Sequence, residues 1–177
     1  MSTYMTTYTK KKIQPLQLQY EDIDIKDIAH ALSLLCRANG HIKYFYSVAQ
    51  HSINCAKEAI ERGYSKKVIK ACLLHDASES YISDIIRPVK KHLSNYLIIE
   101  DTIQSLIYKK YKIGEFSQVE ADQVKQIDDA LLALEMVELM ERDIAIKPVI
   151  KSKQIDLTFR KFEDVEREFL ALFKELT

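Results

Sequence analysis

The stretch Leu73–Ser80 reads LLHDASES and places a histidine and an aspartate directly after two leucines. A glutamate, Glu79, follows His75 by four positions. Ionisable side chains on the apolar face of a helix are costly to bury unless a partner compensates their charge. The stretch therefore predicts a buried helix whose polar side chains converge on a shared ligand.

The composition is that of one globular domain over residues 1–177. Apolar residues make up 47% and charged residues 29% of the 177 residues, enough for a substantial core. With only three glycines and no clear alternating strands, we expect an all-α fold. Basic and acidic residues number 26 each, which argues against a nucleic acid polymer or a membrane as partner but leaves a small anionic ligand open.

The N-terminal residues, the lack of a long apolar stretch and the cysteines indicate a cytoplasmic protein. The opening residues, MSTYMTTYTKKK, lack an apolar core of signal-peptide length. No stretch approaches the roughly 18 apolar residues that span a bilayer. Cys36, Cys55 and Cys72 are widely spaced and form no CxxC motif, so we expect them to be small, reduced core residues.

Apolar residues recur at helical spacing in about six segments, after a short irregular or hairpin arm over residues 1–20. Pro88 should interrupt the chain between the third and fourth helices, and a loop is expected over 144–154. Gly40, Gly63 and Gly114 each follow a helical pattern, where a left-handed glycine often ends a helix. The six predicted helices cover residues 24–37, 47–62, 66–80, 95–111, 118–141 and 157–176.

Two histidines and an aspartate point into the predicted core. His51 lies on the inward stripe of the second helix, although a single buried histidine commonly has only a structural role. His75 lies on the stripe of the third helix, and Asp76 is rotated about 100° from it. A buried aspartate beside a buried histidine needs a cation; the alternative is an aspartate that only orients the histidine.

The fifth helix adds a second carboxylate. Asp128 borders its apolar stripe, whereas Asp129 is rotated toward solvent. Alone, Asp128 could simply pair with a neighbouring base. Together with His51, His75 and Asp76 it forms a two-histidine, two-aspartate set that suits Mn, Co, Fe, Ni or Zn better than Mg. We therefore predict one divalent transition metal.

This pattern resembles the H…HD…D signature of the HD superfamily of metal-dependent phosphohydrolases. The blocks DIAHALSLLCRANGH, FYSVAQHS and LLHDASESYISDIIRPVK resemble successive blocks of bacterial HD-domain 5′-deoxynucleotidases, in the same order and at similar spacing. The likeness runs from about residue 20 to about residue 135. It implies a single-domain helical HD-domain bundle in which the four signature residues hold one metal.

The resemblance also implies roles for residues outside the metal set. Glu79 corresponds to a glutamate that would orient or deprotonate the attacking water; otherwise it is a solvated helix-end carboxylate. Asp84 corresponds to an aspartate near the sugar and the leaving oxygen, or is a loop aspartate. Arg37 corresponds to an arginine that contacts the substrate phosphate. We add Lys90 as a second phosphate-binding cation, unless it is a surface lysine.

The sequence departs from these relatives at three positions. Ala38 follows Arg37 where the well-studied nucleotidases have tryptophan, and the chain contains no tryptophan. Ser83 and Ile86 replace a glycine and a proline around Asp84. These changes concern sugar recognition and loop shape more than phosphate chemistry.

We therefore predict a metal-dependent hydrolase that releases phosphate from (deoxy)nucleoside 5′-monophosphates by attack of a metal-bound water. Two alternatives stay open: another HD phosphohydrolase activity, on a cyclic nucleotide, nucleoside polyphosphate or alarmone, and a non-catalytic nucleotide-sensing module. Because helical HD phosphohydrolases are often dimers, the apolar run FLALF of the last helix is either a homodimer interface or ordinary core.

Overall fold

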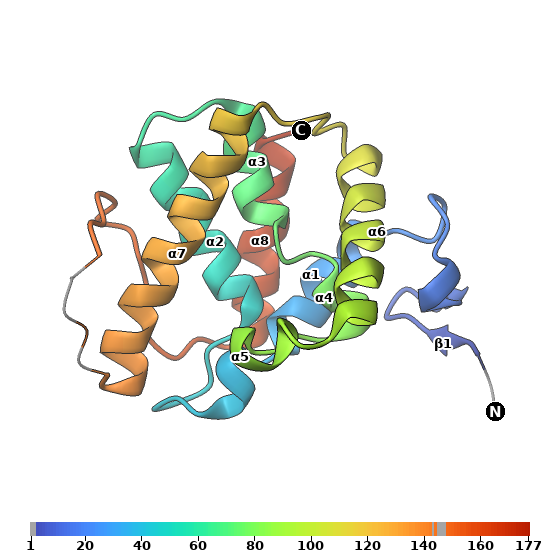
Figure 1. Cartoon of the computed structure of the whole chain (residues 1–177), viewed down its shortest axis with the longest axis horizontal. Coiled ribbons are helices and arrows are strands. Elements are labelled where there is room, and N and C mark those ends of the chain that lie inside the picture. Colours follow the sequence, from blue (N-terminus) through green and yellow to red (C-terminus); the bar gives the residue numbers. More distant parts are fainter. Residues whose placement is uncertain (1–2, 143, 145–147) are drawn as a thin grey trace.

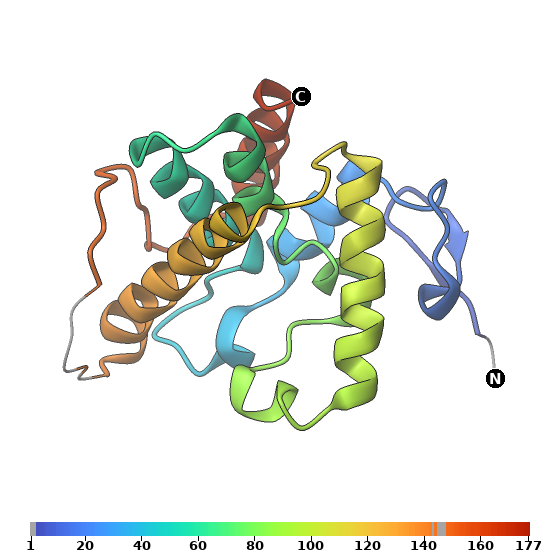
Figure 2. The same ribbon diagram turned by 45° about the horizontal axis from the view of Figure 1, so that its top comes forward.

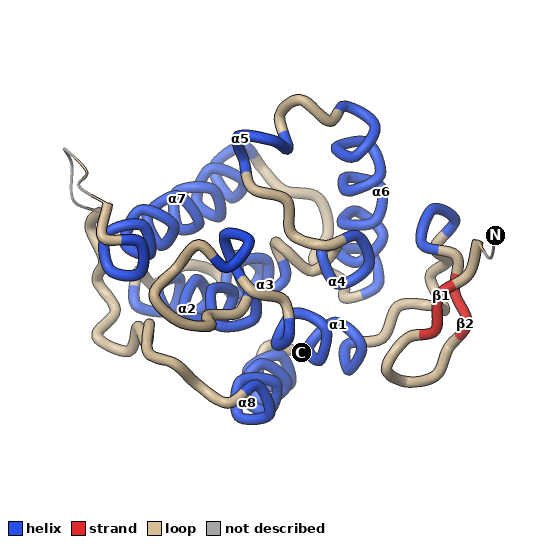
Figure 3. The backbone as a smooth tube through the Cα atoms, turned by 90° about the horizontal axis from the view of Figure 1, so that it is seen from below, coloured by secondary structure: helices blue, strands red, loops and turns tan. Residues whose placement is uncertain are grey.

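Helix α2 (Val48–Glu61) is the element around which four other helices pack. The computed structural model describes residues 3–142, 144 and 148–177. Eleven of the fourteen α2 residues are buried. Figure 1 and Figure 3 show α2 with α7 on one side and α8 on the other. The helices in contact with α2 are α1 (Ile25–Leu34), α3 (Lys66–Leu74), α7 (Gln118–Met140) and α8 (Phe162–Glu175).

The remaining elements lie beside this group. Figure 2 shows α7 in orange across the front and α6 in yellow-green next to it, with the segment that contains α5 between their lower ends. The antiparallel hairpin β1–β2 lies at the end of the molecule away from α7 (Figure 3). The further elements are β1 (Met5–Thr6), β2 (Lys12–Ile13), the short 3-10 helices η1 (Pro15–Gln17) and η2 (Arg37–Gly40), α4 (Glu79–Ile82), α5 (Arg87–Lys90) and α6 (Ser94–Lys110).

These elements confirm the predicted all-α fold with a hairpin arm. Six helices of nine or more residues occur in the part of the chain that the structure describes. One hydrophobic cluster includes buried residues from Ile13 in β2 to Leu176 after α8. Among the described residues, no helix combines the length and the apolar character that a membrane span requires. The loop expected over 144–154 lies partly outside the described residues.

A polar stripe on α2 explains how the irregular segment after α7 is fixed. The side chain of Gln50 donates to the carbonyl of Thr158, and Asn54 bonds both the carbonyl and the N–H of Asp156. The buried Glu58 carboxylate accepts the backbone N–H groups of Lys151 and Ser152. Spaced four residues apart, the three α2 side chains share one face. They satisfy backbone groups that would otherwise be buried without partners.

This stripe also corrects the predicted start of the last helix. Residues 157–161 are not helical, and α8 begins at Phe162. The Asp156 side chain accepts hydrogen bonds from the N–H and hydroxyl of Thr158, and the neighbouring backbone bonds to α2. Such local side-chain bonds compete with helix formation.

Two other helices end earlier than predicted. Helix α1 stops at Leu34 because the chain then crosses to Tyr46 and Ser47 through backbone hydrogen bonds. Helix α3 stops at Leu74, and tight i→i+3 bonds, such as Ala77 N–H to Leu74 O, lead into α4. His75, Asp76 and Glu79 therefore do not lie on one continuous helix, and the predicted helical spacing between them is wrong.

All three glycines have the predicted left-handed conformation, but only Gly63 ends its helix as predicted. Gly63 (φ 70°) ends α2, with Tyr64 N–H bonded to Ala59 O and Gly63 N–H to Ile60 O. Gly40 lies within η2 rather than after α1, and Lys112, not Gly114, is the first left-handed residue after α6.

Ser83 adopts a backbone conformation that is almost restricted to glycine, with φ 72° and ψ 157°. Its N–H donates to Glu79 O at 2.8 Å, and its carbonyl accepts the Tyr96 hydroxyl at 2.7 Å. Ser83 thus adopts a conformation that favours glycine, the residue that the sequence resemblance implies at this position. These two hydrogen bonds hold a strained residue immediately before Asp84.

Ser83→Gly should stabilise the protein. Relief of strain of about 1–3 kcal/mol should exceed the entropy that glycine adds to the unfolded chain, about 0.5–1 kcal/mol. The expected rise in Tm is about 2–4 °C, measured by calorimetry. Ser83→Ala is the control, because it removes the hydroxyl but keeps the Cβ atom. An equal Tm for both variants would refute backbone strain at this residue.

Candidate metal centre

His51 presents one ring nitrogen to the interior between α2, α3 and α7. Its side chain is fully buried, and its Nδ1 lies 2.6 Å from Oε1 of Glu135 on α7. An ionised carboxylate only accepts hydrogen bonds, so Nδ1 of His51 carries the proton and donates it. The neutral ring therefore has its lone pair on Nε2.

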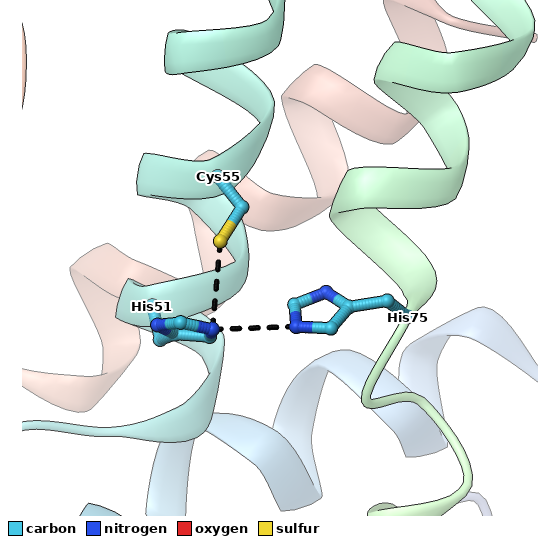
Figure 4. A group of neighbouring side chains, drawn as sticks. All are labelled: His51, Cys55 and His75. Atoms are coloured by element: carbon cyan, nitrogen blue, oxygen red, sulfur yellow. Dashed lines mark hydrogen bonds between the residues drawn. The ribbon is translucent and has the colours of Figure 1, made fainter. Parts of the chain in front are cut away.

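His75 presents its Nε2 to the same point from the end of α3. Its Nδ1 lies 2.8 Å from the carbonyl oxygen of Cys72, which can only accept a hydrogen bond. The two Nε2 atoms of His51 and His75 are 3.3 Å apart, and a dashed line in Figure 4 marks this contact. Two lone pairs at this separation repel each other, so the pair requires a proton or a metal ion between them.

Two aspartates complete the cluster. Oδ1 of Asp128 lies 3.2 Å from Nε2 of His51 and 3.7 Å from Nε2 of His75. Oδ2 of Asp76 lies 3.2 Å and 3.9 Å from the Nε2 atoms of His75 and His51, respectively. Ligand bonds of about 2.0–2.2 Å to one ion place neighbouring ligand atoms roughly 3–3.5 Å apart. The four side chains predicted as ligands therefore converge, with each aspartate oxygen 3.2 Å from one imidazole nitrogen and 3.7–3.9 Å from the other.

Cys55 also reaches this centre. Its Sγ lies 3.4 Å from Nε2 of His51, one turn along α2, and His51, Cys55 and His75 form a group that could hold a metal ion (Figure 4). From the sequence, Cys55 was expected to be only a core residue. Burial raises the pKa of the thiol well above its usual range, and Asp128 raises it further. In the described structure the thiol is therefore a neutral neighbour of the two imidazoles.

The electrostatics of the cluster favour added positive charge. Burial would lower the pKa of His75, but Asp76 and Asp128 raise it well above its ordinary range. Burial would raise the pKa of both aspartates, but the two imidazoles lower it well below the usual range. The carboxylates thus retain positive charge at the rings, which a divalent ion can supply in place of protons.

Two arginines contact the aspartates: Arg87 binds the oxygen of Asp128 that faces away from the imidazoles, and Arg37 binds the oxygen of Asp76 that faces them. Nη2 of Arg87 lies 2.5 Å from Oδ2 of Asp128, and Nη1 of Arg87 lies 2.6 Å from Oδ1 of Asp129. Arg37 places Nη1 3.3 Å from Oδ2 of Asp76 and Nη2 3.2 Å from Oε2 of Glu135. Burial would lower the pKa of Arg37, but Glu135 and Asp76 raise it, so the guanidinium stays charged. Such second contacts fix the orientation of ligand side chains.

A cavity of about 420 Å³ opens beside the cluster. One part of its wall is charged, with Asp76 and Asp128 at the candidate metal centre and Arg37 beside them. Another part is apolar, and its residues include Ile42, Ile85, Ile86, Leu132, Met136 and Leu139. The volume falls in the range of small-molecule sites.

Glu79, Asp84 and Lys90 also line this cavity. Glu79 is 3% exposed, and its Oε2 is buried without a hydrogen-bond partner in the described part of the chain. Burial, together with Asp76, raises the pKa of Glu79 well above its usual range. Burial likewise raises the pKa of Asp84. Lys90 Nζ lies 2.5 Å from Glu100 Oε1 and 3.7 Å from Glu79 Oε1, so this ammonium already has acidic partners.

The structure thus brings every predicted site residue to one cavity or to the cluster beside it. Glu135, Arg87 and Cys55 were not predicted. Helical phase could have indicated two of them, since Glu135 follows Asp128 by seven residues and Cys55 follows His51 by four. Nothing in the sequence pairs Arg87 with Asp128.

Comparison with known proteins identifies relatives of the chain. No family model matches it. The uncharacterized protein YfdR of Escherichia coli K12 is 34% identical over 149 residues, which are 84% of this chain and 79% of YfdR. The uncharacterized protein RCAP_rcc00048 of Rhodobacter capsulatus is 36% identical over 96 residues, which are 51% of this chain and 48% of that protein. Because the match with YfdR extends over most of both chains, this protein belongs to the YfdR family.

Proposed function

We propose that this protein is a metal-dependent phosphomonoester hydrolase of the HD superfamily that acts on (deoxy)nucleoside 5′-monophosphates. The observation that carries the proposal is the convergence of His51, His75, Asp76 and Asp128 beside a cavity that also contains the free Oε2 of Glu79. A purely structural cluster would have no use for a buried carboxylate oxygen without a partner. The resemblance of the surrounding sequence to HD-domain 5′-deoxynucleotidases supports the same activity.

The two imidazoles and two aspartates would hold one divalent transition metal, since mixed nitrogen and oxygen ligands suit Mn, Co, Fe, Ni or Zn. When bound, such an ion supplies Lewis acidity toward a phosphoryl oxygen and makes water a better nucleophile at neutral pH. Cys55 is the competing sulfur donor, although its thiol is held neutral by burial.

The charges that line the cavity support a metal-assisted anion site. Five carboxylates and four basic side chains line it, so without a metal its formal charge does not favour a phosphate. A bound divalent ion would change the formal charge of the cavity lining from negative to positive. Arg37 uses two of its five N–H donors on Asp76 and Glu135, which leaves three for phosphate oxygens. The carboxylates are Asp76, Glu79, Asp84, Asp128 and Glu135, and the basic side chains are Arg37, Arg87, Lys90 and Arg142.

The reaction needs one proton acceptor and one proton donor. Water attacks phosphorus as the bond to the 5′ oxygen breaks, and Oε2 of Glu79 accepts the proton that the water loses. Glu79 acts in its ionised form, which Lys90 and a divalent ion in the cluster would favour. Asp84, which lines the same cavity, donates a proton to the departing 5′ oxygen. Arg37 holds the transferring group in line and offsets its charge. Lys90, paired with Glu100, contributes by neutralising Glu79 rather than by a free contact to phosphate.

The apolar part of the cavity supports a nucleoside as the leaving group. Leu132, Met136 and Leu139 on α7 line it together with Ile42 and Ile85. Such an apolar wall can pack against a nucleobase without forming base-specific hydrogen bonds. Ala38, in the position of a tryptophan in the resembling enzymes, also lines the cavity and leaves the sugar without an aromatic platform there.

Phosphate release from a panel of nucleotides tests the proposal. The protein, loaded with Mn²⁺, Co²⁺ or Mg²⁺, should release phosphate from nucleoside 5′-monophosphates, lose this activity with a chelator, and regain it best with Mn²⁺ or Co²⁺. Glu79→Gln should lower the rate by about a hundredfold or more, the usual contribution of a general base, while its metal content stays unchanged.

The exposed Glu61→Gln is the matched control and should behave as the parent. If the protein hydrolysed only a cyclic nucleotide, a nucleoside polyphosphate or an alarmone, it would be an HD phosphohydrolase with that substrate class instead of nucleoside 5′-monophosphates. No turnover of any compound, with the metal shown to be bound, would instead favour a nucleotide-sensing module.

Variants of the candidate ligands test the metal assignment. Asp128→Asn should lower the affinity for Mn²⁺ or Co²⁺ by at least about tenfold, measured by competition with a chelator. Cys55→Ser should leave this affinity within about twofold. Asp129→Asn is the matched control, because it loses the contact with Arg87 without approaching the imidazoles. A larger loss for Cys55→Ser than for Asp128→Asn would assign the ligand role to sulfur.

A further inference from the structure

Glu135 is the buried one of two glutamates in a mainly apolar stretch of α7. It is 5% exposed, in the run LLALEMVEL. A carboxylate buried to this extent is costly unless strong donors compensate it. The residues that compensate Glu135 therefore indicate why it is there.

Two donors bond this one carboxylate. Oε1 accepts from Nδ1 of His51 at 2.6 Å, and Oε2 accepts from Nη2 of Arg37 at 3.2 Å. Burial would raise the pKa of Glu135, but His51, Arg37 and the hydroxyl of the fully buried Tyr46 lower it, and Asn54 donates to that hydroxyl at 2.9 Å. Each oxygen thus serves a different part of the site.

The contacts close into a ring. From His51 it runs to Glu135 at 2.6 Å, to Arg37 at 3.2 Å, to Asp76 at 3.3 Å, to His75 at 3.2 Å and back to His51 at 3.3 Å. Three of its members are candidate metal ligands, and Arg37 is the candidate phosphate ligand. Glu135 is not one of the four predicted ligands; it contacts the ring members His51 and Arg37.

We propose that Glu135 is a positioning residue that couples the metal-binding imidazole of His51 to the anion-binding guanidinium of Arg37. Its effect on metal binding follows from the cluster alone, whereas its effect on anion binding rests on the proposed function. Without Glu135, Arg37 would keep Asp76 as its acidic partner in the ring and draw this aspartate away from the ion. Metal binding by His51 and anion binding by Arg37 would then both weaken, because Glu135 no longer orients the two side chains.

A carboxylate is required because both neighbours are donors. Glutamine offers one acceptor and one NH₂ group, so its NH₂ group would face an N–H of either His51 or Arg37. Aspartate keeps the charge but is one methylene shorter and cannot span both contacts. Glu135→Gln therefore tests the need for a negative charge, and Glu135→Asp tests the need for the full side-chain length. The exposed Glu138→Gln on the same helix is the matched control.

Two affinities test the coupling: that of the apo protein for Co²⁺, by competition with a chelator, and that of the Co²⁺-saturated protein for inorganic phosphate, by calorimetry. Glu135→Gln should weaken Co²⁺ binding by about 10–100-fold and phosphate binding by at least about fivefold. Glu135→Asp should weaken both by less, and Glu138→Gln should change neither.

Unchanged Co²⁺ affinity in Glu135→Gln would overturn the proposal, as would weakened Co²⁺ binding with unchanged phosphate binding at saturation. Because neither readout needs turnover, an inactive parent would refute the proposed hydrolase without deciding this question.

A measurement on the parent protein covers the case in which the variants do not fold. Nitrogen NMR of the histidine rings in the Zn²⁺-loaded protein should show His51 protonated at Nδ1, with its ring proton shifted far downfield by the short bond to Glu135. A proton on Nε2 of His51 would overturn the proposal.

Discussion

Two imidazole nitrogens that face each other across 3.3 Å are the constraint on which the rest of this site depends. His51 and His75 each use Nδ1 to donate a hydrogen bond, so each directs the lone pair of Nε2 at the other. Only positive charge relieves that repulsion, and the carboxylates of Asp76 and Asp128 lie where they would share it. A cation at this point would also explain the features around it. These are the arginines that contact the aspartates, the adjoining cavity, and the oxygen of Glu79 that has no partner among the described residues.

The fold holds this arrangement through the two faces of α2. One face carries His51 and contacts α3 and α7, while the polar stripe of Gln50, Asn54 and Glu58 binds the backbone of the segment before α8. Asn54 links the two faces of α2. It bonds Asp156 in the segment before α8, and it donates to the hydroxyl of Tyr46, which helps to lower the pKa of Glu135. A ligand on a helix fixed along both faces has little freedom to leave the ion, which is the preorganisation that binding sites require.

Much of this could be predicted from helical phase alone. His51 and Asp128 lie within helices whose apolar stripes are regular, so their inward direction follows from spacing. The end of α3 could not be predicted, because no glycine or proline marks it and the turn is held by Gln104 of α6, whose side chain bonds the carbonyl of Leu74 and the N–H of Ser78. That turn, rather than a continuous helix, lets His75 and Asp76 reach one point. Glu135 was missed for a different reason: a glutamate in a helix is ordinarily solvated, and only the donors brought by α2 and η2 keep it buried.

The most direct test is a crystal structure of the protein grown with Mn²⁺ or Co²⁺, with anomalous scattering to identify the ion. The account predicts one ion bound by Nε2 of His51, Nε2 of His75 and an oxygen each of Asp76 and Asp128, at about 2.0–2.2 Å. An ion held instead by the sulfur of Cys55, with the aspartates turned away, would contradict it, and so would a site that stays empty at millimolar metal.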